Sequence, residues 1–408
     1  MTAAVAEAPA AALLSAAAVR ERCGNVAAAV AAGRSRHFRI DRSRLPHAAE
    51  CVAAVTRERY PDLAIPYHSR WRHFEAGGVD RRAELAHALR GRTPAERGRA
   101  LVDLAVVSVL LDAGAGAAWG FVEAETGRRF TRSEGLGVAS FRAFVGGAFS
   151  ATPGDSLRVD AGALAAIAPA TLAKLFQADE GNPLVGLDGR AALLRRLGAA
   201  LTRETGVFGE QARPGALVDL LTARGTRTTV DAGALLRALL DGLGTIWPGG
   251  TTLDGIALGD TWRHPHAGGA GPTAGLVPFH KLSQWLAYSL FEPFERAGVA
   301  VTGADALTAL PEYRNGGLLV DTGVLALADP AAARVVHAVG SELVVEWRAL
   351  TVALIDELAP RVRALLGRPD LPLACILEGG TWAAGRALAA QLRGGEPPLA
   401  IASDGTVF

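Results

Sequence analysis

SELVVEWRALTVALIDELAPRVRALL, residues 341–366, is the most regular helical pattern in the chain. Its apolar residues recur at alternating three- and four-residue steps, which is the period of one buried face of an α-helix. Ser341 is a favourable N-cap, and Gly367 and Pro369 stop the helix. The apolar face consists of Leu343, Trp347, Leu350, Leu354, Leu358, Val362 and Leu365. This pattern predicts a long helix with one face in the core.

The rest of the chain has the same character. Alanine, leucine and arginine dominate, strand-like alternation is scarce, and half of the 408 residues are hydrophobic. We therefore expect a mainly α protein with a sizeable core. Pro153 and Gly154 lie in a turn-rich stretch. This stretch predicts a boundary between an N-terminal helical lobe, residues 1–150, and a C-terminal helical lobe, residues 151–408, which together form one functional unit.

Charge and cysteine content narrow the class of partner. Lys and Arg number 42 against 41 Asp and Glu, so the balance gives no reason to expect a nucleic-acid or anionic-membrane binder. Cys23, Cys51 and Cys375 are too few and too scattered for a disulfide framework, which favours a cytoplasmic setting. The N-terminus has no basic segment typical of a signal peptide, and the apolar run 101–119 is interrupted by Asp103 and Asp112. We expect a small-molecule protein without a membrane span.

Residues 310–321, LPEYRNGGLLVD, place a carboxylate, a phenol, a guanidinium and an amide side by side. Pro311 restricts its own backbone and biases Leu310 away from helix, and Gly316 and Gly317 permit unusual conformations. The segment is expected to be a shaped loop that holds polar side chains. The alternative is an ordinary exposed connection, since loops are polar by default.

A second polar row lies on the helix predicted over residues 279–292. His280, Gln284, Tyr288 and Glu292 recur every four residues, which places them along one face. Such a row could line a polar pocket or face solvent. Lys and Glu are the residues expected on a solvent-facing stripe, so the composition favours the pocket.

Two further stretches could receive an anion. Residues 66–74, PYHSRWRHF, interleave basic and aromatic side chains, including His68 and Arg70. Guanidinium groups match phosphate oxygens, although a basic surface segment with buried aromatics is an equal alternative. Residues 378–386, EGGTWAAGR, are expected to be a loop that opens a helix, where free backbone amides could bind an anion.

The Gly- and Pro-rich interval 244–278 contains Asp260, Trp262, His264 and His266. A His-x-His pair can ligate zinc, but two ligands alone are weak evidence, so we expect neither a metal nor another cofactor. Glu346 and Arg348 flank Trp347 near the start of the long helix, where they could face a pocket. For Glu342, in the first turn, favourable interaction with the helix dipole is the better interpretation.

With these motifs, the chain resembles the uracil-catabolism protein 4 family, also described as domain of unknown function 1688. The similarity extends over essentially the whole chain. It rests on residues 67–78, 176–183, 279–288, 311–317 and 342–348. The resemblance implies a role in a pyrimidine-breakdown route in which uracil is converted, through a nucleotide and a ribosylated urea, to urea and a three-carbon acid.

A more distant resemblance concerns the chemistry. Queuosine-nucleotide glycosidases, which are helical and related in fold to DNA glycosylases, carry an Asp-Tyr-Arg triplet and, further on, a helix with a Glu-x-Arg motif. Glu312-Tyr313-Arg314 is similar to the first motif, with Glu in place of Asp, and Glu346-Trp347-Arg348 is similar to the second. The extra methylene of Glu312 alters the position of the carboxylate. The resemblance implies a DNA-glycosylase-like fold and an N-glycosidase site.

Together these resemblances imply an N-ribosidase that releases urea from ribosylurea or its 5-phosphate. An ionised carboxylate stabilises the oxocarbenium-like transition state of such a reaction, and Glu312 is the expected residue. Asp260 or Glu346 could protonate the leaving nitrogen if burial raises its pKa. The substrate-binding candidates are Trp262, His280, Gln284, Tyr288, Tyr313 and Arg348, with His68, Arg70 and Arg314 for a 5′-phosphate.

Two other classes of function remain open. The first is a hydrolase of a ring-opened pyrimidine nucleotide, an activity that would call for a metal. Zinc bound near His264, His266 or His280 would favour it. The second is a noncatalytic sensor of a pyrimidine nucleotide, which would bind without forming product.

Overall fold

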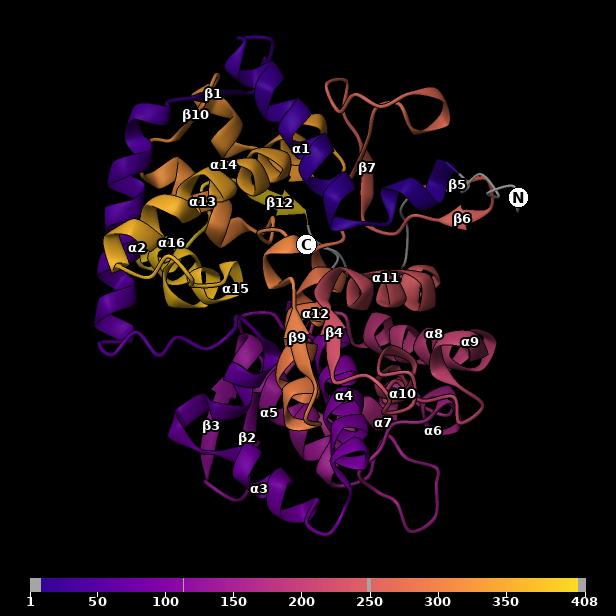
Figure 1. Cartoon of the computed structure of the whole chain (residues 1–408). Coiled ribbons are helices and arrows are strands. Elements are labelled where there is room, and N and C mark those ends of the chain that lie inside the picture. Colours follow the sequence, from indigo (N-terminus) through magenta and orange to yellow (C-terminus); the bar gives the residue numbers. More distant parts are fainter. Residues whose placement is uncertain (1–8, 113, 248–250, 403–408) are drawn as a thin grey trace, which may run out of the picture. The chain divides into compact units, whose positions relative to one another are not determined.

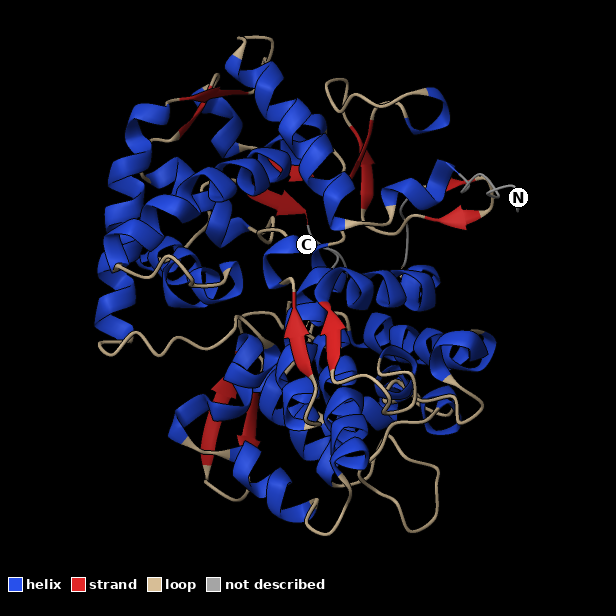
Figure 2. Ribbon diagram, in the orientation of Figure 1, coloured by secondary structure: helices blue, strands red, loops and turns tan. Residues whose placement is uncertain are grey.

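A computed structural model of the chain describes residues 9–112, 114–247 and 251–402. Helices account for most of this structure, and the strands are two to four residues long and pair only in twos (Figures 1 and 2). The prediction of a mainly α protein is confirmed. Among the described residues, no helix is both long and apolar enough to cross a membrane.

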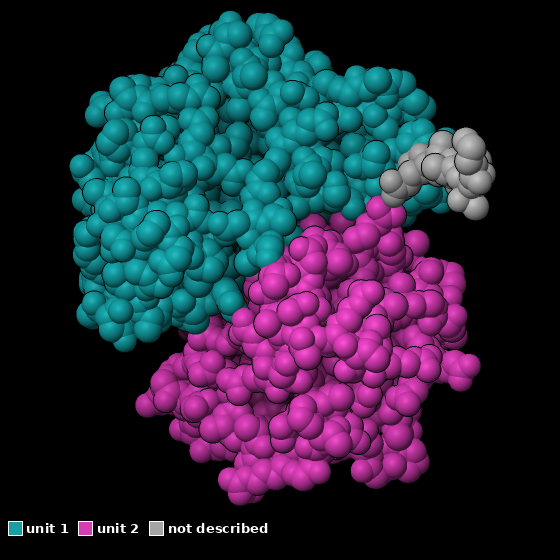
Figure 3. Space-filling model, in the orientation of Figure 1, with its two compact units in different colours: residues 1–68, 249–284, 303–403 teal, residues 69–248, 285–302, 404–408 magenta. Residues whose placement is uncertain are grey.

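The chain forms two compact units (Figure 3). Within the described residues, unit 1 contains 9–68, 251–284 and 303–402, and unit 2 contains 69–247, except 113, and 285–302. Over the described residues, the chain thus passes between the units four times. Residues 150 and 151, where we expected a boundary, both lie in unit 2.

Unit 1 is built around a long helix, α14 (Glu342–Leu366), against which α1 (Ala16–Ala31) and α2 (Leu45–Arg59) pack. The Ser341 hydroxyl accepts a hydrogen bond from the Val344 N–H, and Gly367 ends the helix with a left-handed φ of 67°. The helix predicted from the sequence is therefore confirmed. Its apolar face is buried from Leu343 to Val362, whereas Leu365, near the end of the helix, is 40% exposed.

The other helices of unit 1 are η1 (Pro9–Leu13), η2 (Arg42–Arg44), η5 (Gly271–Thr273), η6 (Ala304–Ala306), α13 (Tyr313–Asp321), η7 (Pro330–Arg334), α15 (Leu373–Ile376), the π-helical turn η8 (Leu377–Thr381) and α16 (Trp382–Arg393). Its strand pairs are β1 (Phe38–Ile40) with β10 (Leu325–Leu327), β5 (Thr252–Leu253) with β6 (Ile256–Ala257) and β7 (Thr261–Arg263) with β8 (Leu276–Pro278), all antiparallel, and the parallel pair β11 (Val336–Ala338) with β12 (Ala400–Ala402).

Unit 2 contains the helices η3 (Arg70–Gly78), α3 (Arg81–Ala88), α4 (Pro94–Leu110), α5 (Arg132–Val145), α6 (Ala161–Ala165), α7 (Pro169–Leu175), α8 (Leu187–Arg203), α9 (Thr205–Phe208), α10 (Ala216–Leu221), α11 (Ala232–Leu243) and η4 (Gly244–Ile246). Its strands pair as β2 (Gly120–Glu123) with β3 (Arg128–Thr131), antiparallel, and β4 (Thr229–Asp231) with β9 (Ala300–Thr302), parallel. Helix α12 (Lys281–Arg296) begins in unit 1 and continues in unit 2.

A buried carboxylate of unit 2 is paired with arginines. The fully buried Glu123 carboxylate accepts two 2.6 Å hydrogen bonds from Arg81 and further bonds from Arg142 and Thr126. Burial alone would raise the pKa of Glu123, but these donors lower it to about 2. The apolar run 101–119, which we expected to be one buried helix, is helical only in part. Residues 101–110 are the C-terminal part of α4, whereas residues 114–119 are not helical.

The expectation of a loop over residues 310–321 is wrong. Tyr313–Asp321 is helix α13, with Glu312 as its N-cap. Gly316 and Gly317 lie inside this helix, and a Cβ on Gly316 would come within 2.8 Å of Trp347 and Thr351. Close packing of α13 on α14, rather than an unusual loop, is therefore the physical reason for a small residue at position 316.

Candidate functional site

Asp260 and Arg348 form an ion pair in unit 1, in which the Arg348 side chain is 1% exposed and that of Asp260 12%. The guanidinium donates to both carboxylate oxygens, at 2.8 and 2.7 Å. The Trp262 indole N–H adds a 2.7 Å bond to Oδ1, and the backbone N–H of Lys281 adds a 3.1 Å bond to Oδ2. Each oxygen of Asp260 thus accepts two hydrogen bonds. Burial alone would raise the pKa of Asp260, but Arg348, Trp262 and Lys281 lower it to about 2.

This environment does not suit a proton donor. Asp260 was a candidate acid on the condition that burial raised its pKa, and Arg348 reverses that shift. The carboxylate instead holds Arg348 in place. The β7–β8 hairpin makes this possible, because its pairing of Thr261 with Pro278 brings Asp260 next to the start of α12.

Arg348 also connects this pair to the start of α13. Its Nε donates to the Pro311 carbonyl oxygen at 3.3 Å, and its guanidinium carbon lies 4.1 Å from the centroid of the Phe279 ring. Glu312 is the next residue after Pro311. Arg348 therefore fixes the backbone from which the Glu312 side chain projects.

Glu312 is partly exposed, and its carboxylate caps α13. Oε2 accepts from the Arg314 N–H at 2.8 Å and Oε1 from the Asn315 N–H at 2.6 Å. Each oxygen accepts one hydrogen bond and keeps acceptor capacity for a ligand. Burial raises the pKa of Glu312, while these amides and the positive charges of Lys281 and His68 partly oppose the rise. Lys281 is a group near Glu312 that the sequence patterns did not indicate.

Glu346 is buried in a separate hydrogen-bond network. It is 1 % exposed, accepts a hydrogen bond from the Ser35 hydroxyl and lies 3.2 Å from Nε2 of His264. Nδ1 of His264 accepts the His266 backbone N–H, so a neutral ring carries its proton on Nε2 and donates it to Glu346. The Glu346 carboxylate joins the turn after α1 and the β7–β8 hairpin to α14. We therefore do not include it among the groups that meet a substrate.

His280 and Gln284 are buried and bond to the backbone or to Thr308. Nε2 of His280 lies 2.9 Å from the Leu13 carbonyl oxygen, and burial lowers the pKa of the ring, which favours the neutral form. Gln284 donates to the Phe279 carbonyl and the Thr308 hydroxyl, and accepts the Thr308 N–H. The predicted polar row is thus divided. His280 and Gln284 hold loops of unit 1 together, and Tyr288 and Glu292 lie in unit 2.

His280 also has a left-handed backbone. Its φ of 50° costs about 1–3 kcal/mol for a residue with a Cβ. The strain occurs where β8 turns into α12, directly before Lys281. Unusual backbone of this kind is common beside functional sites.

The remaining predicted residues fall into two groups. In unit 1, Trp262 packs on Gly340, Tyr313 is 37 % exposed beside Arg314, and the Arg314 guanidinium donates to the Gly395 carbonyl at 3.0 Å. In unit 2, Arg70 is fully buried and pairs with Asp112 at 2.9 Å, and Tyr288 is fully buried against Phe291. Arg70 and Tyr288 are therefore core residues of unit 2.

His68 belongs to unit 1 and pairs with Glu378. Its Nδ1 lies 2.8 Å from Oε2 of Glu378, whose other oxygen accepts from Arg59 at 3.0 Å and from the Tyr60 hydroxyl at 3.1 Å. The expectation of a loop at residues 378–381 is wrong, because η8 is a π-helical turn continuous with α15 and α16. The sequence motif drew attention to Glu378, but nothing in it indicated His68 as the partner.

We call Glu312, Lys281, His68 and Glu378 the Glu312 cluster. It combines a carboxylate of raised pKa with Lys281 and His68, whose charges act on it, and with Glu378, which bonds to His68. The Asp260–Arg348 pair supports its backbone. Within the described ranges, no three His, Cys, Asp or Glu side chains are placed to hold one metal ion.

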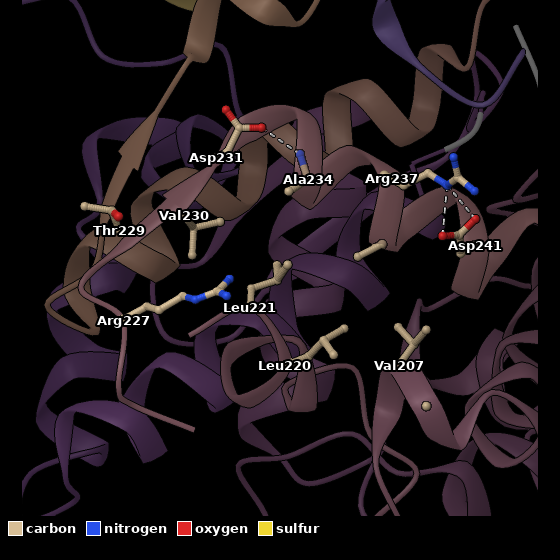
Figure 4. A pocket seen from close by; sticks show the side chains of 12 residues that line it. Val207, Leu220, Leu221, Arg227, Thr229, Val230, Asp231, Ala234, Arg237 and Asp241 are labelled. Atoms are coloured by element: carbon tan, nitrogen blue, oxygen red, sulfur yellow. Dashed lines mark hydrogen bonds and ion pairs between the residues drawn. The ribbon is translucent and has the colours of Figure 1, made fainter. Parts of the chain in front are cut away.

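Unit 2 contains a hollow of about 470 Å³ (Figure 4). Its walls are largely aliphatic, and three of its charged groups have structural partners. Asp231 caps α11 through the Ala234 N–H, and Arg237 pairs with Asp241 one turn later. No histidine is among the described residues that line the hollow, whereas the Glu312 cluster combines carboxylates with a histidine and a lysine, so we regard that cluster as the candidate site.

Comparison with known proteins agrees with this chain-wide arrangement of motifs. The chain is 39% identical to Uracil catabolism protein 4 of Lachancea kluyveri over 409 residues, covering 92% of this chain and 93% of the relative. It is also 39% identical to Protein urg3 of Schizosaccharomyces pombe over 386 residues, covering 91% and 92%. The family described as Protein of unknown function (DUF1688) matches residues 12–408. The chain therefore belongs to the DUF1688 family.

Proposed function

We propose that this protein acts in uracil catabolism as an N-ribosidase that hydrolyses ribosylurea or its 5-phosphate to urea and ribose or ribose phosphate. The name of the Lachancea kluyveri relative supports the pathway, since the two chains align over nearly their full lengths. The reaction is our inference from the Glu312 cluster.

The observation that carries the proposal is the position of Glu312. Its carboxylate is partly exposed, is held by two backbone N–H groups, and keeps one acceptor position on each oxygen. Breaking a ribosyl C–N bond builds positive charge on the sugar, and an adjacent carboxylate stabilises that charge. The same carboxylate can take a proton from the attacking water.

The surrounding groups support this role by fixing geometry. Arg348 binds the Pro311 carbonyl and is itself held by Asp260, so the residue before Glu312 cannot move independently of α14. Gln284 similarly holds Thr308, four residues before Glu312. A rigid first helical turn positions the carboxylate to within the small tolerance that catalysis requires.

The decisive experiment follows urea release from ribosylurea and, separately, from ribosylurea 5-phosphate. Wild-type protein is expected to release urea from at least one of them, and Glu312→Gln should be slower by about 100-fold or more. Gln retains one oxygen to cap α13, so the loss of stability should stay within about 1 kcal/mol. Glu342→Gln, a change at the partly exposed first turn of α14, is the matched control and should leave the rate unchanged.

Other results would support different functions. Absence of urea from both compounds with saturable binding would favour a nucleotide sensor. Hydrolysis of a ring-opened pyrimidine nucleotide that is lost with a chelator would favour the alternative hydrolase. Either result would reject the N-ribosidase.

A further inference from the structure

The His68 ring is held in one orientation by two contacts to the same segment. Its backbone N–H donates to the Ala374 carbonyl in α15 at 3.0 Å. Its Nδ1 lies 2.8 Å from Oε2 of Glu378 in η8. Both main chain and side chain are thus attached to residues 374–378, which limits rotation of the imidazole.

The protonation of this pair follows from Glu378. Burial opposes ionisation of Glu378, but His68 and Arg59 lower its pKa, so it is a carboxylate at neutral pH. A carboxylate only accepts hydrogen bonds, so Nδ1 of His68 must be the donor. Nε2 then remains for another molecule. Within the part of the chain that the structure describes, no group bonds to Nε2, and the His68 side chain is 14% exposed.

The backbone beneath Glu378 is specialised to hold it. A π-helical turn is rare, and such turns occur frequently at functional sites. The turn packs directly on α2, because a Cβ on Gly380 would lie 2.5 Å from Val52 Cγ1 and 2.6 Å from the Val52 carbonyl oxygen. The same helix, with the residue that follows it, provides Arg59 and Tyr60, which hold the Glu378 carboxylate.

His68 and Glu312 are attached to elements that pack on each other, since η8, which holds His68 through Glu378, contacts α13, whose N-cap is Glu312. In agreement with this packing, the charge of His68 contributes to the pKa of Glu312. The other two candidate acids are occupied by hydrogen bonds within the protein. Asp260 accepts four hydrogen bonds, and Glu346 is sealed between Ser35 and His264. We propose that His68, oriented by Glu378, is the catalytic acid that protonates the departing nitrogen. This inference rests on the proposed N-ribosidase reaction, and it gives His68 a different role from the phosphate binding suggested by the sequence.

The step balances as a hydrolysis. The ribosyl C1′–N bond breaks, its electron pair passes to nitrogen, and that nitrogen takes the Nε2 proton of the His68 imidazolium. The water oxygen bonds to C1′ and loses a proton to the Glu312 carboxylate. Urea and ribose leave, and transfer of the Glu312 proton to His68 through solvent restores the starting state. Glu378 is a positioning residue, which stabilises the imidazolium as carboxylates do in other His-dependent sites.

The test compares two leaving groups. Urea must be protonated to depart, whereas 4-nitrophenolate is stable as an anion. His68→Gln should lower kcat/KM for ribosylurea by about 100- to 10,000-fold, and for 4-nitrophenyl riboside by less than about 5-fold. Glu378→Gln should show the same selectivity with a smaller loss. Glu312→Gln should impair both substrates, because its role does not depend on the leaving group.

Chemical rescue provides a second readout that does not require the nitrophenyl substrate. Added imidazole should restore urea release to His68→Gly in proportion to its concentration. His337→Gln, in β11 of the same unit, is the matched control and should behave as wild type. Equal losses on both substrates, or no rescue by imidazole, would show that His68 is structural. Absence of urea from the wild type would reject the N-ribosidase itself, and this inference with it.

Discussion

Asp260 and Glu312 are carboxylates of the same unit whose surroundings shift their pKa values in opposite directions. A guanidinium, an indole N–H and a backbone N–H hold the Asp260 pKa at about 2. Glu312 has two amides and two more distant cations, which do not overcome the effect of burial. Burial favours the neutral form of both acids, and the number and proximity of donors decide the outcome.

The first prediction concerns Lys281. Its charge lowers the pKa of Glu312, so Lys281→Met should raise that pKa further. If ionised Glu312 is required, kcat/KM for urea release falls as the pH drops through this pKa. The acid limb of the pH profile should therefore move to higher pH in the variant. The backbone N–H of Lys281, which bonds to Asp260, is retained.

Lys174→Met is the matched control, because Lys174 lies in α7 of unit 2. Its pH profile should coincide with that of the wild type. An acid limb that stays in place or moves to lower pH in Lys281→Met would contradict the assignment of Glu312 as the base.

At the scale of elements, the position of Glu312 depends on how closely two helices approach. A Cβ on Gly385 of α16 would lie 2.1 Å from the Arg314 carbonyl oxygen in α13. The obstacle is backbone, which cannot move aside as a flexible side chain could. Only glycine permits this packing, so α16 determines where the first turn of α13 lies.

We predict that Gly385→Ala costs about 1–3 kcal/mol of unfolding free energy, because it forces α13 and α16 apart. Urea release should fall as well, since Glu312 moves with α13. Gly24→Ala in α1 is the control, as its Cβ meets nothing within 4 Å and should add about 0.5–1 kcal/mol through helix propensity. Denaturant midpoints measure both changes. Equal unfolding free energies of Gly385→Ala and Gly24→Ala would show that the contact between α13 and α16 does not require glycine at position 385.

At the scale of the whole molecule, each unit contains a carboxylate that arginine holds in the ionised form. In unit 1, Asp260 bonds to Arg348. In unit 2, Glu123 bonds to Arg81 and Arg142. The folded pKa of Glu123 is about 2, below its ordinary value of 4.5. Its contribution to stability is therefore present above pH 4.5 and is lost as the pH falls towards 2.

We predict that Glu123→Gln costs about 3–5 kcal/mol at pH 7, because it leaves Arg81 buried without its counter-charge. The difference from wild type should shrink as the pH falls from 4.5 towards 2. Urea denaturation at a series of pH values measures it. Glu180→Gln, an exposed change in unit 2, should lie within about 0.5 kcal/mol of wild type at pH 7. A difference for Glu123→Gln that is independent of pH would contradict this account.

Local pattern was sufficient to predict the mainly α character and the helix at 341–366, because periodicity and capping act within a few residues of each other. It was also sufficient to select Glu312, Asp260 and His68 as candidate site residues. A DNA-glycosylase-like fold and a cytoplasmic location stay predictions.

Only the tertiary structure decided what those residues contact. Local rules predicted a loop at Gly316. A glycine is required there because the Trp347 ring, 31 positions later, leaves no space for a Cβ. Glu346 and Asp260 were equal candidates as acids until Ser35, His264 and Arg348 surrounded them. His68 meets Glu378 across 310 positions of sequence. A pKa or a hydrogen bond depends on neighbours in space, and the folding of distant segments determines which neighbours a residue has.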